Sequence, residues 1–316
     1  LGAFSEISAF SFRAFLKIRE LLRHISFDVI HDNQCIGYGL LLMRSFGIPV
    51  VATIHHPLSV DLENALERAS SFANRMKGVM FYPILMQRVV SKRLDHVITV
   101  SEDSRRRINS DFGVPMEKQT VVYNGLDESI FRPIPGVGKK KGKMLFVGNV
   151  EDGKKGFVYL LKALTMVKSD LRLTVVDGGS PHRRLAGALI ERLGLGGRIE
   201  FTGKTDTASL VRHYCESEMV VVPSVYEGFG FPAAEAMACG VPVIASDGGA
   251  LPEVVGEAGV IVPARDERAL ACAIDGLYSD RKLMRRLGSE GNARVLKEFN
   301  WTRAVERMVS VFRSLA

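Results

Sequence analysis

The sequence predicts an α/β fold that contains two Rossmann-like, doubly wound domains, each built on a parallel sheet. Short apolar runs rich in β-branched residues alternate with helical patterns along the chain. These runs are continuous rather than alternating, as in parallel strands that are buried on both faces. A segment rich in Pro, Gly and Lys interrupts the series once, and 316 residues are enough for two ordinary domains.

The first domain is expected to cover residues 1–133. Its strands are predicted at 28–31, 49–54, 96–100 and 120–123, with helices over 12–24 and within 61–93. Only helical sequence precedes the first of these strands, whereas a complete doubly wound domain needs more strands on that side. We therefore expect this domain to be incomplete at its start, with its opening strands absent from the chain.

A linker is expected at 134–143, because one proline, three glycines and four lysines in this segment cannot pack a core. The second domain follows over 144–300. Its strands are predicted at 144–147, 173–176, 199–202, 219–222, 241–245 and 259–262. Its helices are predicted at 157–167, 181–193, 208–215, 232–238, 267–279 and 281–297. In the C-terminal segment 301–316, an amphipathic helix at 302–315 could cross back to the first domain.

Charge and cysteine content narrow the class of protein. The formal net charge is +7, and a diffuse basic excess suits a protein that handles nucleotides, phosphates or an acidic membrane surface. No aromatic-basic module of the RNA-recognition type is visible, so no nucleic-acid partner is expected. The four cysteines show no CxxC or zinc-type spacing, which favours buried free thiols and a reducing, cytoplasmic compartment.

The strongest chemical signal is EGFGFPAAEAMACG at 227–240, which follows an apolar strand and opens a helix. Gly228 and Gly230 let the backbone approach a ligand closely. A helix N-terminus behind such a turn is an anion site, suited to a diphosphate. Glu227 precedes the turn, and Glu235, after seven intervening residues, can accept hydrogen bonds from ribose hydroxyls.

This segment, extended to EGFGFPAAEAMACGVPVIAS, resembles the nucleotide-sugar signature of the retaining glycosyltransferases of family 4, with their E-x7-E motif. The resemblance covers nearly the whole chain through FVGN and KKGF, LTVVDGGS, VVYNGLDESIF, GGALPEVVGEAGVIVP and FNWTRAVERM. It implies a GT-B fold, in which two Rossmann-like domains face a cleft, and retention of configuration at the anomeric carbon. Relative to that pattern, the first part of the N-terminal domain is lacking.

The resemblance also implies roles for single residues. Glu235 would bind the ribose, and Glu227 would hold hydroxyls of the transferred sugar. The backbone of the turn would hold the sugar as well, through Gly228, Phe229, Gly230 and Phe231.

Basic residues would neutralise the leaving diphosphate in place of magnesium, so no metal ion and no cofactor are expected. Lys155 matches the lysine that the family places before a glycine. Asn149 stands where the family usually has an arginine, so one charge-assisted contact is lost, and Lys154 could compensate. Lys204 is a further donor-binding candidate near the base.

In the first domain, ATIHHP at 52–57 ends a predicted strand with two histidines. His55 matches the histidine with which the family faces the sugar across the cleft, and with Glu227 and Lys155 it completes the candidate catalytic residues. Adjacent histidines on a strand point to opposite sides, so these two are not expected to chelate a metal together.

The segment 72–93 is both basic and apolar. Family members that act on lipid acceptors dock on anionic membranes through such surfaces of the first domain. A core helix with a solvated basic face is the alternative.

The sequence therefore predicts a metal-independent retaining glycosyltransferase that moves a hexosyl group from a nucleotide-diphosphate sugar to a glycan or a lipid-linked acceptor. A cytoplasmic location is expected, with a peripheral position at the inner membrane face as its variant. The rival hypothesis is a non-catalytic, degenerate nucleotide-sugar-binding protein, which the short start and Asn149 favour. Another GT-B enzyme, such as a sugar-nucleotide epimerase, is a third hypothesis, and the full EGFGFPAAE string argues against it.

Overall fold

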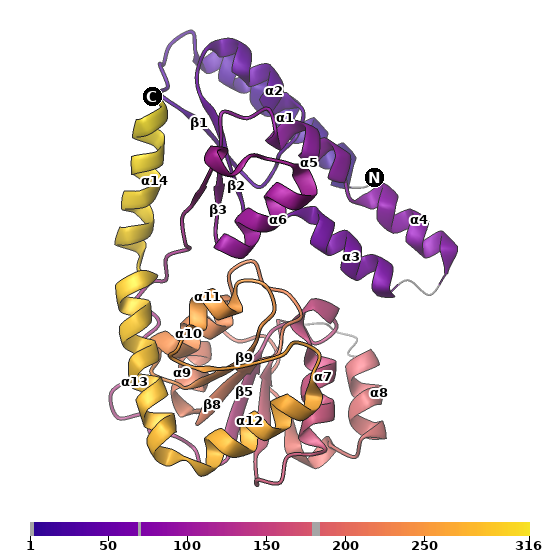
Figure 1. Ribbon diagram of the computed structural model, residues 1–316, viewed down its shortest axis with the longest axis vertical. Helices are drawn as coiled ribbons and strands as arrows, with labels where there is room; N and C mark the ends of the chain where they lie inside the picture. The colour runs from indigo at the N-terminus through magenta and orange to yellow at the C-terminus, as the bar shows by residue number, and fades with distance from the viewer. Residues whose placement is uncertain (1–2, 69–70, 179–183) are drawn as a thin grey trace. The chain divides into compact units, whose positions relative to one another are not determined.

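The structure is a computed structural model that describes residues 3–68, 71–178 and 184–316. It divides into two compact units (Figure 1), which are Leu1–Tyr123 with Ala304–Ala316, and Asn124–Arg303. The chain thus leaves the first unit about ten residues before the predicted linker and returns to it within the last helix. No helix in the described ranges is long and apolar enough to cross a bilayer.

The first unit is built on a four-stranded sheet in the order β1-β2-β3-β4, with every pair parallel. The strands are β1 (Ile30–Asn33), β2 (Val50–Ile54), β3 (His96–Thr99) and β4 (Gln119–Val121). All five residues of β2 are buried, which explains why its sequence is apolar without alternation. The four strands predicted in this part of the chain are confirmed, with ends displaced by one or two residues.

Helices of the first unit differ more from the prediction. They are α1 (Ala3–Leu21), α2 (Gly39–Met43), α3 (Leu58–Arg68), α4 (Phe72–Phe81), α5 (Ile84–Ser91) and α6 (Glu102–Phe112), with short 3-10 turns η1 (Arg44–Phe46) and η2 (Met116–Lys118). The helical region predicted within 61–93 is three helices, and Pro83, which lacks a backbone N–H, precedes the last of them. No prediction covered α6, which Ser101 caps by accepting a hydrogen bond from the Ser104 N–H.

The last helix, α14 (Trp301–Leu315), lies along the four-stranded sheet (Figure 1). Its residues Met308, Val311 and Phe312 pack against Val51 and Ile98 of the sheet. The C-terminal segment therefore completes the core of the first unit.

The second unit is built on a six-stranded parallel sheet in the order β10-β9-β8-β5-β6-β7. The strands are β5 (Lys143–Val147), β6 (Arg172–Val176), β7 (Ile199–Phe201), β8 (Met219–Val222), β9 (Val243–Ser246) and β10 (Val260–Val262). Counted within this unit, the order is 3-2-1-4-5-6, the arrangement of a doubly wound Rossmann fold. All six predicted strands are confirmed.

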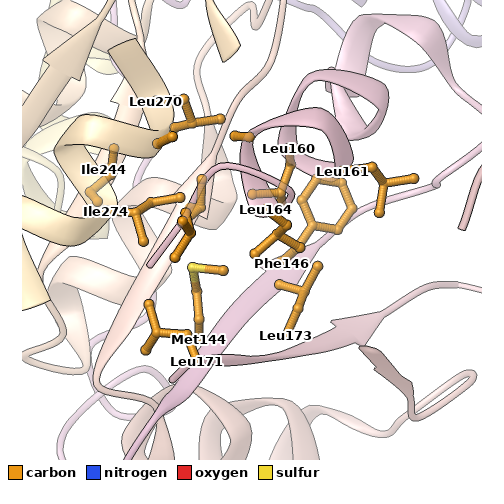
Figure 2. Close-up of a cluster of buried hydrophobic side chains, with 14 of the residues drawn as sticks. Met144, Phe146, Leu160, Leu161, Leu164, Leu171, Leu173, Ile244, Leu270 and Ile274 are labelled. Carbon is orange, nitrogen blue, oxygen red and sulfur yellow. The ribbon is translucent and has the colours of Figure 1, made fainter. Parts of the chain in front are cut away.

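Helices cover both faces of this sheet (Figure 1). They are α7 (Phe157–Leu164), α8 (Arg184–Arg192), α9 (Thr207–Glu216), α10 (Phe231–Ala238), α11 (Leu251–Val255), α12 (Glu267–Ser279) and α13 (Arg281–Glu298), with 3-10 turns η3 (Gly153–Lys155) and η4 (Gly196–Arg198). Figure 2 shows the main core, where leucines of α7 meet Phe146 of β5 and Ile274 of α12. The start of the helix predicted at 181–193 lies outside the described residues.

The segment predicted as a linker is bound to the second unit. The Lys140 N–H donates to the Glu216 carbonyl at 2.8 Å, and the Gly142 N–H donates to Glu218 Oε2 at 2.7 Å. Lys143 Nζ also pairs with Glu216 Oε2 at 2.9 Å. These contacts hold the lysine-rich segment against the end of the sheet at which β5 starts.

All four cysteines lie in described parts of the chain, and none is in a disulfide. Cys215 and Cys239 are buried, as expected, whereas Cys35 is half-buried and Cys272 is exposed. The expectation of burial is wrong for Cys272, because the helical sequence around it does not reveal which face points to solvent.

Candidate functional site

The strand order of the second unit reverses between β5 and β8, and we call the site formed by the loops at this point the crevice. From β5 the chain proceeds to β6 on one side, and after β7 it returns to β8 on the other side. The loops that leave the carboxyl ends of these two neighbouring strands therefore diverge, and such a switch point is where doubly wound sheets bind ligands. The loop after β5 contains Lys155, and the loop after β8 contains Glu227.

Backbone contacts hold these two loops together. The Val225 N–H donates to the Lys154 carbonyl at 2.7 Å. Gly156 has a φ of +66°, and a Cβ at this position would lie 1.9 Å from the Pro223 carbonyl oxygen. Only glycine fits there. A Cβ would clash with that oxygen, and a left-handed φ is unfavourable for residues that have a Cβ.

Glu227 is the most constrained acidic residue of the crevice. Its side chain is buried, and its Oε1 accepts hydrogen bonds from Lys155 Nζ at 2.7 Å and from Ser224 Oγ at 2.8 Å. Its backbone carbonyl accepts from the Ala250 N–H at 2.9 Å. The carboxylate is thus fixed next to an ammonium group, which offsets the cost of burying its charge.

The glycine turn that follows is shaped by two neighbouring segments. Gly230 has a φ of +100°, and a Cβ on it would lie 2.7 Å from Leu251 Cδ2. A Cβ on Gly249 would lie 2.4 Å from the Glu227 carbonyl oxygen. The Phe229 ring is buried in an edge-to-face contact with Phe299, with centroids 5.5 Å apart, so only the backbone of Phe229 is left for a ligand.

Helix α10 begins directly after this turn, with Gly230 as its N-cap in a left-handed conformation. Pro232 has no N–H and the Ala233 N–H donates to the Gly230 carbonyl at 3.0 Å, so it is mainly the dipole of the helix that favours a negative charge there. Phe231, the first residue of α10, has an exposed side chain. The site therefore combines an ammonium group, a helix N-terminus and a glycine turn, which together suit a phosphorylated ligand.

Glu235 lies further along α10, and its side chain is hydrogen-bonded to a residue of the neighbouring helix α9. Tyr214, which is fully buried, donates its hydroxyl hydrogen to Glu235 Oε2 at 2.6 Å. Burial raises the pKa of Glu235, and the hydrogen bond from Tyr214 opposes that increase. The pKa of Tyr214 is raised well above its usual value by burial and by the Glu235 carboxylate, so its hydroxyl stays protonated and acts as the donor.

Three other predicted residues lie outside this cluster of side chains. Asn149 is exposed, and its Oδ1 accepts from the Glu151 N–H at 2.9 Å, as in a turn. Lys154 is engaged through its backbone, since its N–H donates to Asp152 Oδ1 and its carbonyl accepts from Val225. Lys204 is exposed and follows β7, which is separated from β5 by β6.

His55 lies in the first unit, where β2 ends beside β1. Its Nε2 is 2.8 Å from Asn33 Oδ1. Gln34, with a φ of +68°, accepts from the His55 N–H at 2.5 Å and donates to the His56 carbonyl at 2.9 Å. Burial, together with His56 and His31, lowers the pKa of His55, so its ring is neutral at neutral pH and donates to Asn33.

Neighbouring histidines have other partners. His56 Nε2 is 2.9 Å from Asp61 Oδ2, and His31 Nε2 is 2.8 Å from Thr53 Oγ1. No three His, Cys, Asp or Glu side chains gather as a metal site in the described ranges.

Sequence reasoning missed two residues of the crevice. Ser224 comes three residues before Glu227, so a hydroxyl directly after a buried strand was a signal that could have identified it. Tyr214 carries no motif signal, because its place beneath Glu235 depends on how α9 and α10 pack.

Two family models match the chain. The model described as "Glycosyltransferase Family 4" matches residues 2–130, and the one described as "Glycosyl transferases group 1" matches residues 141–280. The two matches fall on the two units of the structure, apart from a few residues at the crossover.

Among curated proteins, the chain is 33% identical to the MMP alpha-(1->4)-mannosyltransferase of Mycolicibacterium hassiacum, over 98% of this chain and 76% of that protein. It is 27% identical to the D-inositol 3-phosphate glycosyltransferase of Thermomonospora curvata, over 90% of this chain and 71% of that protein.

Solved structures agree on the architecture. The sucrose-phosphate synthase of Thermosynechococcus elongatus is 28% identical, with a TM-score of 0.80 over 96% of this chain and 78% of that one. HepE of Anabaena, solved with UDP and glucose, is 22% identical, with a TM-score of 0.74 over 99% of this chain and 84% of that one. Its likeness supports the fold.

Proposed function

Because this chain belongs to glycosyltransferase family 4, we propose that the crevice at the carboxyl ends of β5 and β8 binds its nucleotide-sugar donor. The protein is a retaining glycosyltransferase of GT-B fold that transfers a hexosyl group from a nucleotide sugar to an acceptor. The observation that supports this location is the 2.7 Å contact between Lys155 Nζ and Glu227 Oε1 at the switch point of the sheet.

Lys155 and the N-terminus of α10 hold the diphosphate in this proposal. As the bond between the sugar and the phosphate breaks, negative charge grows on the leaving diphosphate. An ammonium group and oriented N–H groups that are already in place stabilise that charge without reorganisation. A divalent metal ion is then not required, because the protein itself supplies the positive charge.

The two glutamates divide the remaining work. Glu235 accepts hydrogen bonds from the ribose, and Glu227 with the backbone at 228–231 holds hydroxyls of the transferred sugar. Ser224 helps to keep Glu227 in place through its hydrogen bond to Oε1. His55, a neutral histidine fixed by Asn33, is proposed to hydrogen-bond a hydroxyl of the donor or the acceptor.

Calorimetry with nucleoside diphosphates tests the binding part of this proposal. A thermal-shift screen of UDP, GDP and ADP, free and as sugar conjugates, first identifies the base, because a bound ligand raises apparent stability by mass action. The relative at 33% identity transfers mannose, so mannosyl donors come first in the screen. With the best diphosphate, Glu235→Ala is expected to weaken binding by roughly 1–3 kcal/mol, the scale for losing charged hydrogen bonds. An unchanged affinity would refute the ribose assignment.

A second proposal concerns the segment 72–93 of the first unit, which we infer to contact anionic membranes. Phe72 is 79% exposed and Leu85 is 70% exposed, which is unusual for large apolar side chains. Arg75 and Arg88 are exposed on the same two helices, α4 and α5. Exposed apolar groups beside basic ones suit the boundary between anionic headgroups and acyl chains.

Co-sedimentation with vesicles tests this surface. Binding is expected to vesicles that contain an anionic phospholipid, and to be lost in Phe72→Ser with Leu85→Ser. Leu185→Ser is the control, because Leu185 is 67% exposed on α8 of the second unit. Equal binding of all variants, or no binding of the wild type, would exclude this surface as a membrane contact.

A further inference from the structure

The hydrogen-bonded pair of buried Tyr214 and half-buried Glu235 carries an inference that rests on the proposed ribose role of Glu235. Tyr214 comes from α9 and Glu235 from α10, and the hydrogen bond of 2.6 Å between them is one of the shortest side-chain contacts near the crevice. No motif of the sequence marks this tyrosine. This contact links α10, which bears the proposed ribose-binding Glu235, to α9, which contributes no other residue to the proposed site.

We propose that Tyr214 is a positioning residue, which fixes one carboxylate oxygen of Glu235 so that the other is presented to the ribose hydroxyls of the donor. Oε2 is taken by the tyrosine, and within the described ranges Oε1 has no hydrogen-bond partner. A glutamate side chain has three rotatable bonds and loses considerable rotamer freedom when it binds a ligand. A short hydrogen bond to Oε2 removes much of that freedom before the ligand arrives.

Tyr214 is itself well placed to hold a fixed position. It is 0% exposed, and its ring meets Phe131 edge to face with centroids 6.5 Å apart. The start of α9 is capped by Asp206, whose side chain accepts from the Ser209 N–H at 2.7 Å. After the end of the helix, Ser217 Oγ donates to the His213 carbonyl at 2.7 Å.

The tyrosine also acts against the cost of burying the carboxylate. Burial alone favours the protonated form of Glu235, which would have a weaker acceptor oxygen. The hydroxyl of Tyr214, which stays protonated, donates to the carboxylate and stabilises its charged form instead. Phenylalanine at this position would keep the packing and remove both effects, which makes the substitution a clean test.

Discrimination between ribo- and deoxyribonucleotides is the measurement that separates positioning from packing. The dissociation constants of the best nucleoside diphosphate and of its 2′-deoxy and 3′-deoxy forms are measured for wild type, Tyr214→Phe and Glu235→Ala. A purely structural defect would weaken all three ligands equally. Loss of positioning weakens only the ligands that carry the hydroxyl to which Glu235 binds.

For Tyr214→Phe we expect the ribo form to bind about fivefold more weakly, the scale of one hydrogen bond, with the deoxy form that lacks the hydroxyl bound by Glu235 almost unaffected. Glu235→Ala is expected to abolish the discrimination. Tyr278→Phe is the control, because Tyr278 stacks on Arg281 and its hydroxyl bonds that arginine instead of Glu235.

Two outcomes overturn the inference, and they are distinguishable. If Glu235→Ala keeps the wild-type discrimination, the proposed ribose role fails, and the positioning role fails with it. If Glu235→Ala abolishes discrimination while Tyr214→Phe keeps it, or weakens ribo and deoxy forms equally, only the positioning role of Tyr214 fails.

Discussion

Lys155 Nζ lies 2.7 Å from Glu227 Oε1, although 72 residues of sequence separate the two. The phosphate-binding lysine and the sugar-binding glutamate of the proposed site are thus paired with each other before any ligand is bound. An incoming diphosphate is expected to compete with Glu227 for the ammonium group. Ser224 keeps its own hydrogen bond to the same oxygen, so Glu227 stays in place when Lys155 turns to the phosphate.

Replacing Lys155 by alanine tests the cationic half of this pair. Loss of a charged hydrogen bond to phosphate is expected to weaken nucleoside diphosphate binding by roughly 1.5–3 kcal/mol, about 10- to 150-fold, measured by calorimetry. Lys282→Ala is the control, because Lys282 is exposed at the start of α13 and has no proposed role in the site. Comparable losses in both variants would mean that the phosphate is not bound at Lys155.

Glu227→Gln tests the acidic half. The variant is expected to bind nucleoside diphosphate within about fivefold of wild type, because Lys155 is released for the phosphate and one hydrogen bond is worth about 1 kcal/mol. The rate of sugar transfer is expected to fall by about 100-fold or more, the scale for losing a group that stabilises the transition state. A parallel loss of diphosphate binding and transfer would contradict this division between the two glutamates.

Gly156→Ala is expected to destabilise the protein by about 2–5 kcal/mol and to impair nucleotide binding. Its Cβ would lie 1.9 Å from the Pro223 carbonyl oxygen, and its φ of +66° is unfavourable for alanine. Denaturant unfolding measures the loss. Gly187→Ala in α8 is the matched control, since nothing lies within 4 Å of its added Cβ. It is expected to be neutral or to stabilise the helix by up to about 1 kcal/mol, and an equal effect of both substitutions would refute the role of the close approach.

Glu235→Gln is expected to raise thermal stability at neutral pH while it weakens nucleotide binding. The pKa of Glu235 is raised in the folded protein by burial. Glu235 therefore contributes to the stability of the fold while its carboxyl is protonated. This contribution is lost as the pH rises from the pKa of Glu235 in the unfolded chain through its higher pKa in the folded protein. Glutamine avoids that loss and can still accept the hydrogen bond of Tyr214.

The measurement is the difference in Tm between Glu235→Gln and wild type, without nucleotide. It should grow as the pH rises above the ordinary glutamate pKa of 4.5, and it should level off once Glu235 is ionised in the folded protein. A difference in Tm that does not change with pH, or that favours the wild type, would show that burial does not raise the pKa of Glu235.

Transfer is expected to need no divalent metal, because Lys155 and the N-terminus of α10 carry the charge of the leaving diphosphate. Turnover in the presence of EDTA should match turnover with added magnesium or manganese. Activity that EDTA abolishes and either metal restores would refute this prediction.

The sequence determined the strands and the chemistry of single segments. All ten strands were identifiable as short runs rich in apolar and β-branched residues, and central strands such as β2 and β8 are continuous because they are buried on both faces. Helix α6 escaped prediction because EDSRRRINSDF is mostly polar, and only a few residues such as Ile108 face the core. Helices α2 and α11 were missed because five residues are too few to show a helical period.

For the site, the motif EGFGFPAAE and the lysine before Gly156 could be recognised in the sequence, since a glycine turn, a helix start and a cation are local features. Which side chains meet was decided by tertiary structure alone. Lys155 reaches Glu227 because the sheet order places β5 beside β8, and Tyr214 reaches Glu235 because α9 packs on α10. Strand order and helix packing arise from burial summed over a whole unit, so no short stretch of sequence contains them.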